Sequence, residues 1–328
     1  MLRILHNTNY DFIKWWRPSL VLRVVFIATG LVLLAVNGLR TSVEFTGGTF
    51  LQVHFRTAPN ADVIRDALAS VGLKGVELQR FGSDLDYSVR APAQTGEEHA
   101  SGERTRDIVE RELHERFGDT SRVQVVRAEN IGPTVGAELR RKAAIAMLIA
   151  FVITLVYLAI RFEWRFGLAA VAANMHEVFA TFAFISIMRL EFSPTVLAAI
   201  LTVIGYSLND TIIIFDRVRE NLRTKRKERL YDVVNRSINE TLPRSVLTHV
   251  TVFAASLSLL LFAGPILRPF AWIMTFGVVT ATFTSIYVSG ALLLWIDRTW
   301  PAESRAKASS ALARPGAETS RPAVRRGA

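Results

Sequence analysis

The 328-residue sequence contains no cysteine, so it can form no disulfide and offers no thiolate ligand to a metal ion. It also lacks the charge balance of a typical soluble domain, with 39 Lys and Arg against 29 Asp and Glu. Hydrophobic residues make up 50% of the chain, and the mean hydropathy is positive. Soluble globular proteins rarely combine these properties, so the composition indicates a membrane protein with basic loops.

Two motifs that begin like catalytic sites are incomplete. His176-Glu177 starts like the zinc-protease HExxH motif, but Ala180 stands where the second histidine would be. Gly205-Tyr206-Ser207 starts like the GxSxG motif, but Asn209 replaces its second glycine. The basic residues are also not gathered on one amphipathic face, which disfavours nucleic-acid binding. We therefore expect no enzyme, no metal or other cofactor, and no nucleic-acid partner.

Long apolar runs are the dominant feature of the sequence. A hydrocarbon core of about 30 Å needs about 20 apolar residues as a helix. Six segments approach that length, at roughly 19–38, 143–160, 167–188, 195–215, 246–264 and 270–296. The first lacks a small-residue cleavage site, so we interpret it as a retained helix with Trp15 and Trp16 at the interface. Arg23 is close enough to that end for its side chain to extend back to the headgroups.

Lys and Arg concentrate in four places: the leader 1–18, the connection 161–165, the loop 217–244 and the tail from 298. All four fall on one side if the six helices alternate in direction. The positive-inside rule then places both termini in the cytoplasm. We interpret residues 298–328, rich in Ala, Arg, Pro and Ser, as a disordered basic cytoplasmic tail that is drawn to anionic membrane lipid.

Residues 39–140 form the one long stretch able to make a soluble domain, and the same alternation places it outside the cytoplasm. Alternating apolar residues predict strands at 49–55, 75–81, 85–91 and 121–128. Helical patterns cover 60–68, with Asn60 as the N-cap, and 103–117. This β-α-β-β-α-β order predicts a ferredoxin-like α+β domain between the first and second membrane helices. Residues 92–104 are expected to be a flexible loop or a frayed helix start.

Polar residues interrupt the apolar segments in three places. An ionisable group at the centre of a membrane helix costs about 2.5–3.5 kcal/mol on insertion scales, so each needs a partner or a water-lined cavity. Helical spacing places Tyr206 on the same face as Asn209 and Asp210. The interruptions are His176-Glu177 in the third segment, Asn209-Asp210 in the fourth, and Arg244 with Thr248 and His249 at the start of the fifth.

Asp210 and Arg244 are the most natural ion pair in the membrane, provided that the fifth helix begins earlier, near Ile238, or that the arginine reaches inward. One interpretation is a structural pair, with Asn209 hydrogen-bonding across helices. The other is a proton site: burial disfavours a charged carboxylate and a nearby arginine favours it, so moving Arg244 would switch the proton affinity of Asp210. Asn209 and Glu177 are further proton-transport candidates, although His176 or another helix could satisfy Glu177.

Three segments resemble the SecF family of the bacterial SecDF complex. They are SVEFTGGTFLQV at 42–53, IGPTVGAEL at 131–139 and VIGYSLNDTIIIFDRVREN at 203–221, and the similarity covers roughly residues 8–297. The resemblance implies an RND-like bundle of six helices in the bacterial inner membrane, a periplasmic domain and a SecD partner. It further implies proton-driven assistance to preprotein export through SecYEG.

The resemblance also implies residue roles. Asp210 matches an intramembrane aspartate of the family and Arg244 an arginine of the following helix, both associated with proton transport. Glu177 and Glu44 stand where Asp is common. The stretch 243–249 departs from the family's usual Ser/Thr-rich pattern.

Glycines flank the outer domain at both membrane junctions. Gly47-Gly48 precedes the domain, and Gly132 and Gly136 follow it. Glycine permits tight bends and close backbone approach, so these four residues are candidate hinge positions on which the domain could rock.

Three functions remain open from the sequence. The first is a proton-coupled subunit of an export motor. The second is a small-molecule transporter of the RND type, although such proteins are much longer chains with two six-helix halves. The third is a structural scaffold that stabilises a partner, in which Asp210 and Arg244 only hold the bundle together.

Overall fold

The computed structural model describes residues 8–300 apart from 72, 74–75, 81–82, 93–100, 119–122, 225–227 and 265. Six helical segments are long and apolar enough to cross a membrane. They are α1 (Trp16–Asn37), α5 (Pro133–Arg161), α6 (Trp164–Ile187), α7 (Pro194–Thr224), α8 (Leu230–Phe262) and a sixth built from α9 (Arg268–Phe283), a π-helical segment (Thr284–Ser289) and α10 (Gly290–Thr299). A 3₁₀ turn, Ile13–Trp15, leads into α1.

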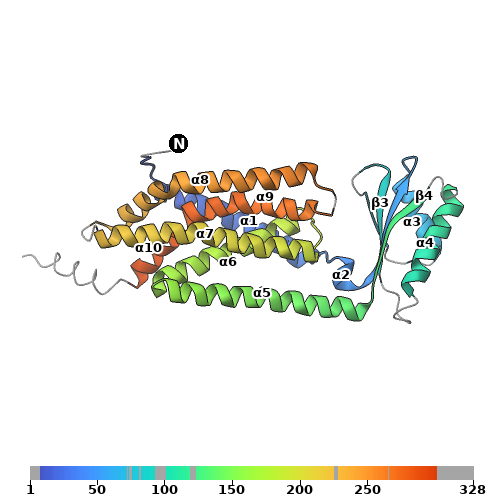
Figure 1. Ribbon diagram of the computed structural model, residues 1–328, viewed down its shortest axis with the longest axis horizontal. Helices are drawn as coiled ribbons and strands as arrows, with labels where there is room; N and C mark the ends of the chain where they lie inside the picture. The colour runs from blue at the N-terminus through green and yellow to red at the C-terminus, as the bar shows by residue number, and fades with distance from the viewer. Residues whose placement is uncertain are drawn as a thin grey trace, which may run out of the picture.

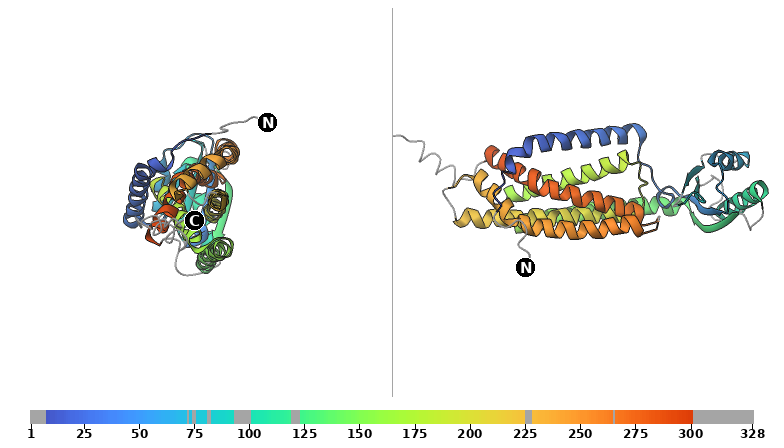
Figure 2. Two further views of the ribbon diagram at one scale, coloured as in Figure 1. Left: turned by 90° about the vertical axis from the view of Figure 1, so that its left-hand side faces the viewer. Right: turned by 90° about the horizontal axis from the view of Figure 1, so that it is seen from above.

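The molecule is elongated, with the helices side by side and a small α+β domain at one end (Figure 1). α1 begins and α10 ends at the opposite end of the bundle, and α5 runs along the bundle from the domain. The right-hand view of Figure 2 shows the same separation from above. The prediction of one small domain inserted between the first two membrane helices agrees with this arrangement.

The small domain contains a four-stranded antiparallel sheet in the order β2-β3-β1-β4. Its elements are α2 (Val43–Thr46), β1 (Gly48–Phe55), α3 (Ala61–Ser70), β2 (Glu77–Arg80), β3 (Asp86–Pro92), α4 (Ser101–Phe117) and β4 (Val123–Ile131). Asn60 caps α3 as predicted, because its side chain accepts a hydrogen bond from the backbone of Asp62 at 2.9 Å.

The core of this domain follows from strand alternation. Leu51, Val53 and Phe55 project from one face of β1 and are almost completely buried. They pack against Tyr87 and Val89 of β3 and against the apolar residues of both helices. Burying such a side chain stabilises the fold by about 1.5–3 kcal/mol, so one helix-covered face of a small sheet supports the domain.

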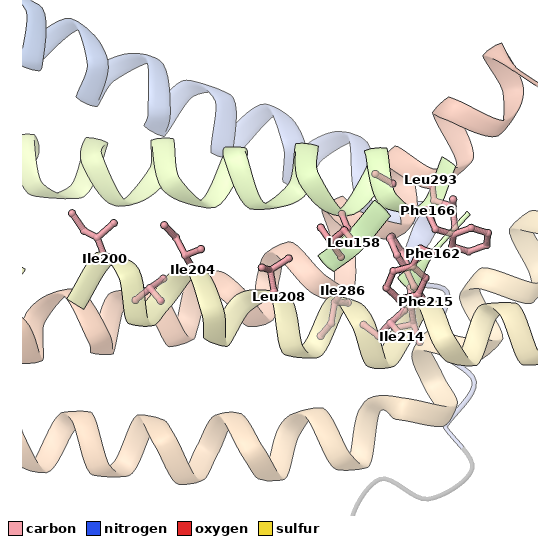
Figure 3. Close-up of a cluster of buried hydrophobic side chains, with 14 of the residues drawn as sticks. Leu158, Phe162, Phe166, Ile200, Ile204, Leu208, Ile214, Phe215, Ile286 and Leu293 are labelled. Atoms are coloured by element: carbon pink, nitrogen blue, oxygen red, sulfur yellow. The ribbon is translucent and has the colours of Figure 1, made fainter. Parts of the chain in front are cut away.

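The membrane helices divide into an inner and an outer group. In α6, α7 and the α9–α10 segment, 50–61% of the apolar window is buried, against 6–17% in α1, α5 and α8. Figure 3 shows the core between the inner helices, where Ile200, Ile204 and Leu208 follow one face of α7. The outer helices therefore present most of their apolar surface to the surroundings of the chain.

Two boundaries differ from the sequence predictions. The predicted loop 217–244 is mostly helix, because α7 continues to Thr224 and α8 already begins at Leu230. Hydropathy detects only the lipid-compatible part of a helix, whereas these polar turns are stabilised by contacts such as Asn221 to Ser237 at 3.0 Å. Most of the predicted loop 92–104, namely 93–100, and the tail 301–328 lie outside the described residues.

Candidate functional site

Asp210 lies near the middle of α7 and is 3% exposed. The Ser245 hydroxyl of α8 donates a hydrogen bond to its Oδ1. Its Oδ2 is buried and has no hydrogen-bond partner in the described part of the chain. Buried polar atoms in proteins almost always have a hydrogen-bond partner, so the unpartnered oxygen distinguishes Asp210 as a candidate functional residue.

Arg244 does not pair with Asp210, contrary to the expected ion pair. Both residues are described, no salt bridge joins them, and Arg244 is exposed. The reason is geometric. Successive helical residues are about 100° apart, so when Ser245 faces α7, Arg244 points out of the bundle. The earlier start of α8 does place Arg244 well inside a helix, at the level of Asp210.

Asn209 is also exposed, and the structure gives it no hydrogen bond across helices. Tyr206, placed on the same face by sequence, instead turns toward α8. Its ring meets the His249 imidazole edge-on, with centroids 5.2 Å apart. The polar side chains that gather around Asp210 are therefore Tyr206, Ser245 and His249, and the last two were not predicted as site residues.

A second buried charge cluster joins α1, α6 and the sixth membrane segment. Arg23 is 6% exposed and Glu177 fully buried, and their side chains are 3.1 Å apart. Arg23 also donates to the Thr280 carbonyl at 3.2 Å and to the Thr284 hydroxyl at 2.8 Å. The hydroxyls of Thr280 and Thr284 donate to the Glu177 carboxylate. Glu177 is thus satisfied on both oxygens.

The prediction that Arg23 extends back to the headgroups is wrong, and Glu177 is satisfied by Arg23 and not by His176. Arg23 and Gly30 are the two buried residues of α1, seven positions apart on one face. A Cβ built at Gly30 would lie 2.2 Å from the Cβ of Ala183, so α1 packs directly on α6. The spacing of Arg23 and Gly30 is the sequence signal that could have identified this face.

The glycines at the membrane junctions pack against each other. Gly47 has φ +77°, and a Cβ at Gly136 would lie 2.8 Å from the Gly47 nitrogen. Gly48 also has positive φ, at 140°, while Gly132 is extended at the start of α5. The segments that enter and leave the small domain therefore contact each other at these glycines. A side chain at Gly47 or Gly136 would prevent that contact.

Further contacts tie the small domain to the bundle. Arg90 of β3 forms a salt bridge with Glu191 in the α6–α7 connection. The Ser42 nitrogen donates to the Phe192 carbonyl at 3.0 Å, and the Phe192 nitrogen donates to the Arg40 carbonyl at 2.7 Å. A cavity of about 120 Å³ lies beside these contacts, lined by Ser42, Arg90 and Glu191 among others. If the domain rocks, these contacts must either break or move together with the domain. The hinge therefore remains a prediction.

Comparison with known proteins places this architecture among export proteins. Residues 111–299 match the family described as protein export membrane protein SecD/SecF, C-terminal. The chain is 54% identical over 305 residues to the protein translocase subunit SecF of Gemmatimonas aurantiaca, covering 92% of this chain and 91% of the relative. It is 39% identical to the SecF of Desulfurispirillum indicum, with 87% and 90% covered.

Comparison with solved structures leads to the same family. The chain is similar to the crystal structure of SecDF, a translocon-associated membrane protein from Thermus thermophilus, with a TM-score of 0.80, 31% identity and 91% of this chain covered. A second SecDF structure, in a super-membrane-facing form, gives a TM-score of 0.66 at 31% identity, with 94% of this chain covered. The chain spans 40% and 41% of those two chains.

Proposed function

Because the chain belongs to the SecD/SecF family of protein export membrane proteins, we propose that it is the SecF subunit of a SecDF complex that uses the proton motive force. In this proposal the complex assists preprotein translocation through SecYEG. The chain acts as a motor subunit and not as an enzyme, and it uses no metal or other cofactor.

The observation that carries the proposal is the state of Asp210. Its carboxylate is buried at the middle of the bundle, and one oxygen lacks a partner within the described residues. A proton moving through the full membrane potential releases about 2.3 kcal/mol per 100 mV. Binding and release of that proton change the charge at a helix–helix contact, which can bias two arrangements of the bundle.

The proposed orientation follows the basic loops. The start of α1, the 161–165 connection, and the ends of α7 and α8 at Thr224 and Leu230 lie at the end of the bundle far from the sheet, which supports cytoplasmic termini in the bacterial inner membrane. The small domain then lies in the periplasm. Its β-α-β-β-α-β order with strands β2-β3-β1-β4 supports the ferredoxin-like assignment.

A SecD-like partner explains why the outer surface of α7 and α8 exposes an arginine and a stripe of small and polar residues. Arg244 is exposed at the level of Asp210, where lipid would surround it in the isolated chain. Beside it runs an exposed stripe of small and polar residues: Ala198, Thr202, Gly205 and Asn209 on α7, and Thr248 and Thr251 on α8. Small residues allow close helix packing, and an arginine in lipid needs a carboxylate partner. We therefore place a membrane helix of the partner on this stripe.

The scaffold alternative rests on the Arg23–Glu177 cluster, in which both carboxylate oxygens of Glu177 are hydrogen-bonded. If holding helices together were the whole function, Asp210 would also be replaceable. The two proposals therefore differ in what they require of Asp210.

The test is Asp210→Asn in the complete complex, in inverted membrane vesicles with and without a proton gradient. The proposal expects normal assembly and loss of the gradient-dependent part of export. Asp216→Asn is the matched control, since Asp216 lies on the same helix, half-exposed, and pairs with Arg161 at 2.6 Å. Retained stimulation in the Asp210 variant would exclude the proton-coupled function.

A further inference from the structure

His249 is a buried histidine beside Asp210. It lies on α8 one helical turn beyond Ser245, about 6 Å closer to the sheet end of the bundle, and is 5% exposed. Tyr206 of α7 packs against its ring at an interplanar angle of 77°. The Tyr206 ring on α7 and the Ser245 carbonyl on α8 therefore fix where the imidazole lies.

The hydrogen bond at Nδ1 determines the tautomer. Nδ1 lies 2.6 Å from the carbonyl oxygen of Ser245. Because a carbonyl oxygen only accepts, Nδ1 must carry the hydrogen, and Nε2 of the neutral ring holds the lone pair. Nε2 is buried and has no hydrogen-bond partner in the described part of the chain. The ring thus holds a proton acceptor that is buried and has no partner among the described residues.

Ser245 connects this acceptor to Asp210. Its hydroxyl donates to Asp210 Oδ1, and its carbonyl accepts from His249 Nδ1. Each of the two side chains that Ser245 holds has one buried atom without a partner among the described residues, Asp210 Oδ2 and His249 Nε2. An acid and a base are therefore positioned by the two polar groups of one residue.

The His249 ring is also next to a groove at the surface of the chain. His249 lines an open groove of about 430 Å³ between α8 and the sixth membrane segment, together with Thr282 and Tyr287. The titratable groups around His249 are Tyr206, which packs on its ring, Tyr287, which lines the same groove, and Asp210, which is bonded to the same serine. Arg244, on the same helix, points away from the bundle.

We infer that His249 carries protons between the periplasmic half of the bundle and Asp210. In the transfer step the Nε2–H bond of the imidazolium breaks and an O–H bond forms at Asp210 Oδ2. The products are neutral imidazole and neutral carboxylic acid, so one proton moves and charge balances. This inference rests on the proposed function, since it adds a donor to the Asp210 site.

The test compares three variants in the complete complex, with gradient-dependent export measured in vesicles across pH. His249→Asn keeps a donor near the Nδ1 position for the Ser245 carbonyl but removes Nε2. His249→Ala leaves a space open to the groove, through which added imidazole can enter. His176→Asn is the matched control, another intramembrane histidine whose ring nitrogens have no partners in the described chain.

We expect both His249 variants to assemble normally and to lose at least about tenfold in gradient-dependent export, a lower bound for a positioned proton donor. Millimolar imidazole should restore the Ala variant several-fold, and the His176 control should match the wild type. Wild-type rates and pH dependence in His249→Asn, or loss without imidazole rescue in His249→Ala, would overturn the inference. Asp210→Asn separates the two claims, because the proposed function fails only if that variant keeps its stimulation.

Discussion

The bundle buries two acidic side chains in opposite ways. Glu177 is enclosed by Arg23 and two threonine hydroxyls, so its charge is matched and both oxygens are bonded. Asp210 has one serine hydroxyl on one oxygen and nothing on the other within the described chain. Breaking a satisfied buried pair is costly, whereas a carboxylate oxygen without a partner is open to a further hydrogen bond. We therefore propose that Glu177 serves packing and that Asp210 binds the proton.

The largest expected effect comes from breaking the satisfied pair. Removing one partner leaves an uncompensated buried charge, so Arg23→Met alone should destabilise the chain by about 3–5 kcal/mol. Replacing both residues, Arg23→Met with Glu177→Leu, should restore most of that loss and keep gradient-dependent export. Denaturant unfolding in detergent and vesicle export measure the two effects.

Arg161→Met provides the control for this experiment, because its pair with Asp216 is half-exposed and should contribute less than about 1 kcal/mol. A stable, assembled double variant without export would contradict the comparison and return Glu177 to the proton path.

The next effect concerns the packed junction of the small domain. In Gly136→Ala the new Cβ would lie 2.8 Å from the Gly47 nitrogen and 3.0 Å from the Phe45 carbonyl oxygen, and backbone cannot yield as a side chain does. We expect a loss of about 1–3 kcal/mol. Gly205→Ala, with open space around its Cβ, should leave the stability of the isolated chain unchanged or slightly higher. Equal unfolding midpoints for the two variants would refute the close contact.

The hinge prediction can be tested because the chain contains no cysteine. Cysteines at positions 90 and 191, in place of the salt-bridged Arg90 and Glu191, can be joined by a thiol-specific cross-linker without side reactions. A domain that rocks during export should lose most gradient-dependent export, several-fold, when cross-linked, while the uncross-linked double variant remains active. Full activity after complete cross-linking would show that the domain works fixed to the bundle.

Sequence alone predicted the parts of this fold that depend on regular patterns. Apolar runs identified six membrane helices, and alternation in 39–140 gave the order of strands and helices. The sequence did not predict which residue of α8 faces Asp210, because that depends on the rotation of the helix about its axis. Arg244 and Ser245 are neighbours, yet Ser245 is buried and Arg244 is exposed. The prediction also failed for Arg23, since the tendency of arginine to reach headgroups is general, whereas the close α1–α6 contact at Gly30 is specific to this packing.

The smallest expected effect lies outside the membrane. The Ser83 hydroxyl and then the His54 ring bond to Asp86, and they hold the pKa of that carboxyl below its usual range. A lowered folded-state pKa contributes stability that is present above the unfolded pKa, near 3.9, and is lost as pH falls through the folded value. Ser83→Ala should reduce the stability of the domain above about pH 4 and leave it unchanged at lower pH. Unfolding followed by near-ultraviolet circular dichroism across pH measures this.

The central claim, that Asp210 and not Glu177 is the carboxyl that exchanges protons, is tested most directly by infrared difference spectroscopy of the complete complex between high and low pH. We predict a protonated-carboxyl band that disappears in Asp210→Asn and persists in the Arg23→Met, Glu177→Leu double variant. A band that persists in Asp210→Asn and disappears in the double variant would contradict the account.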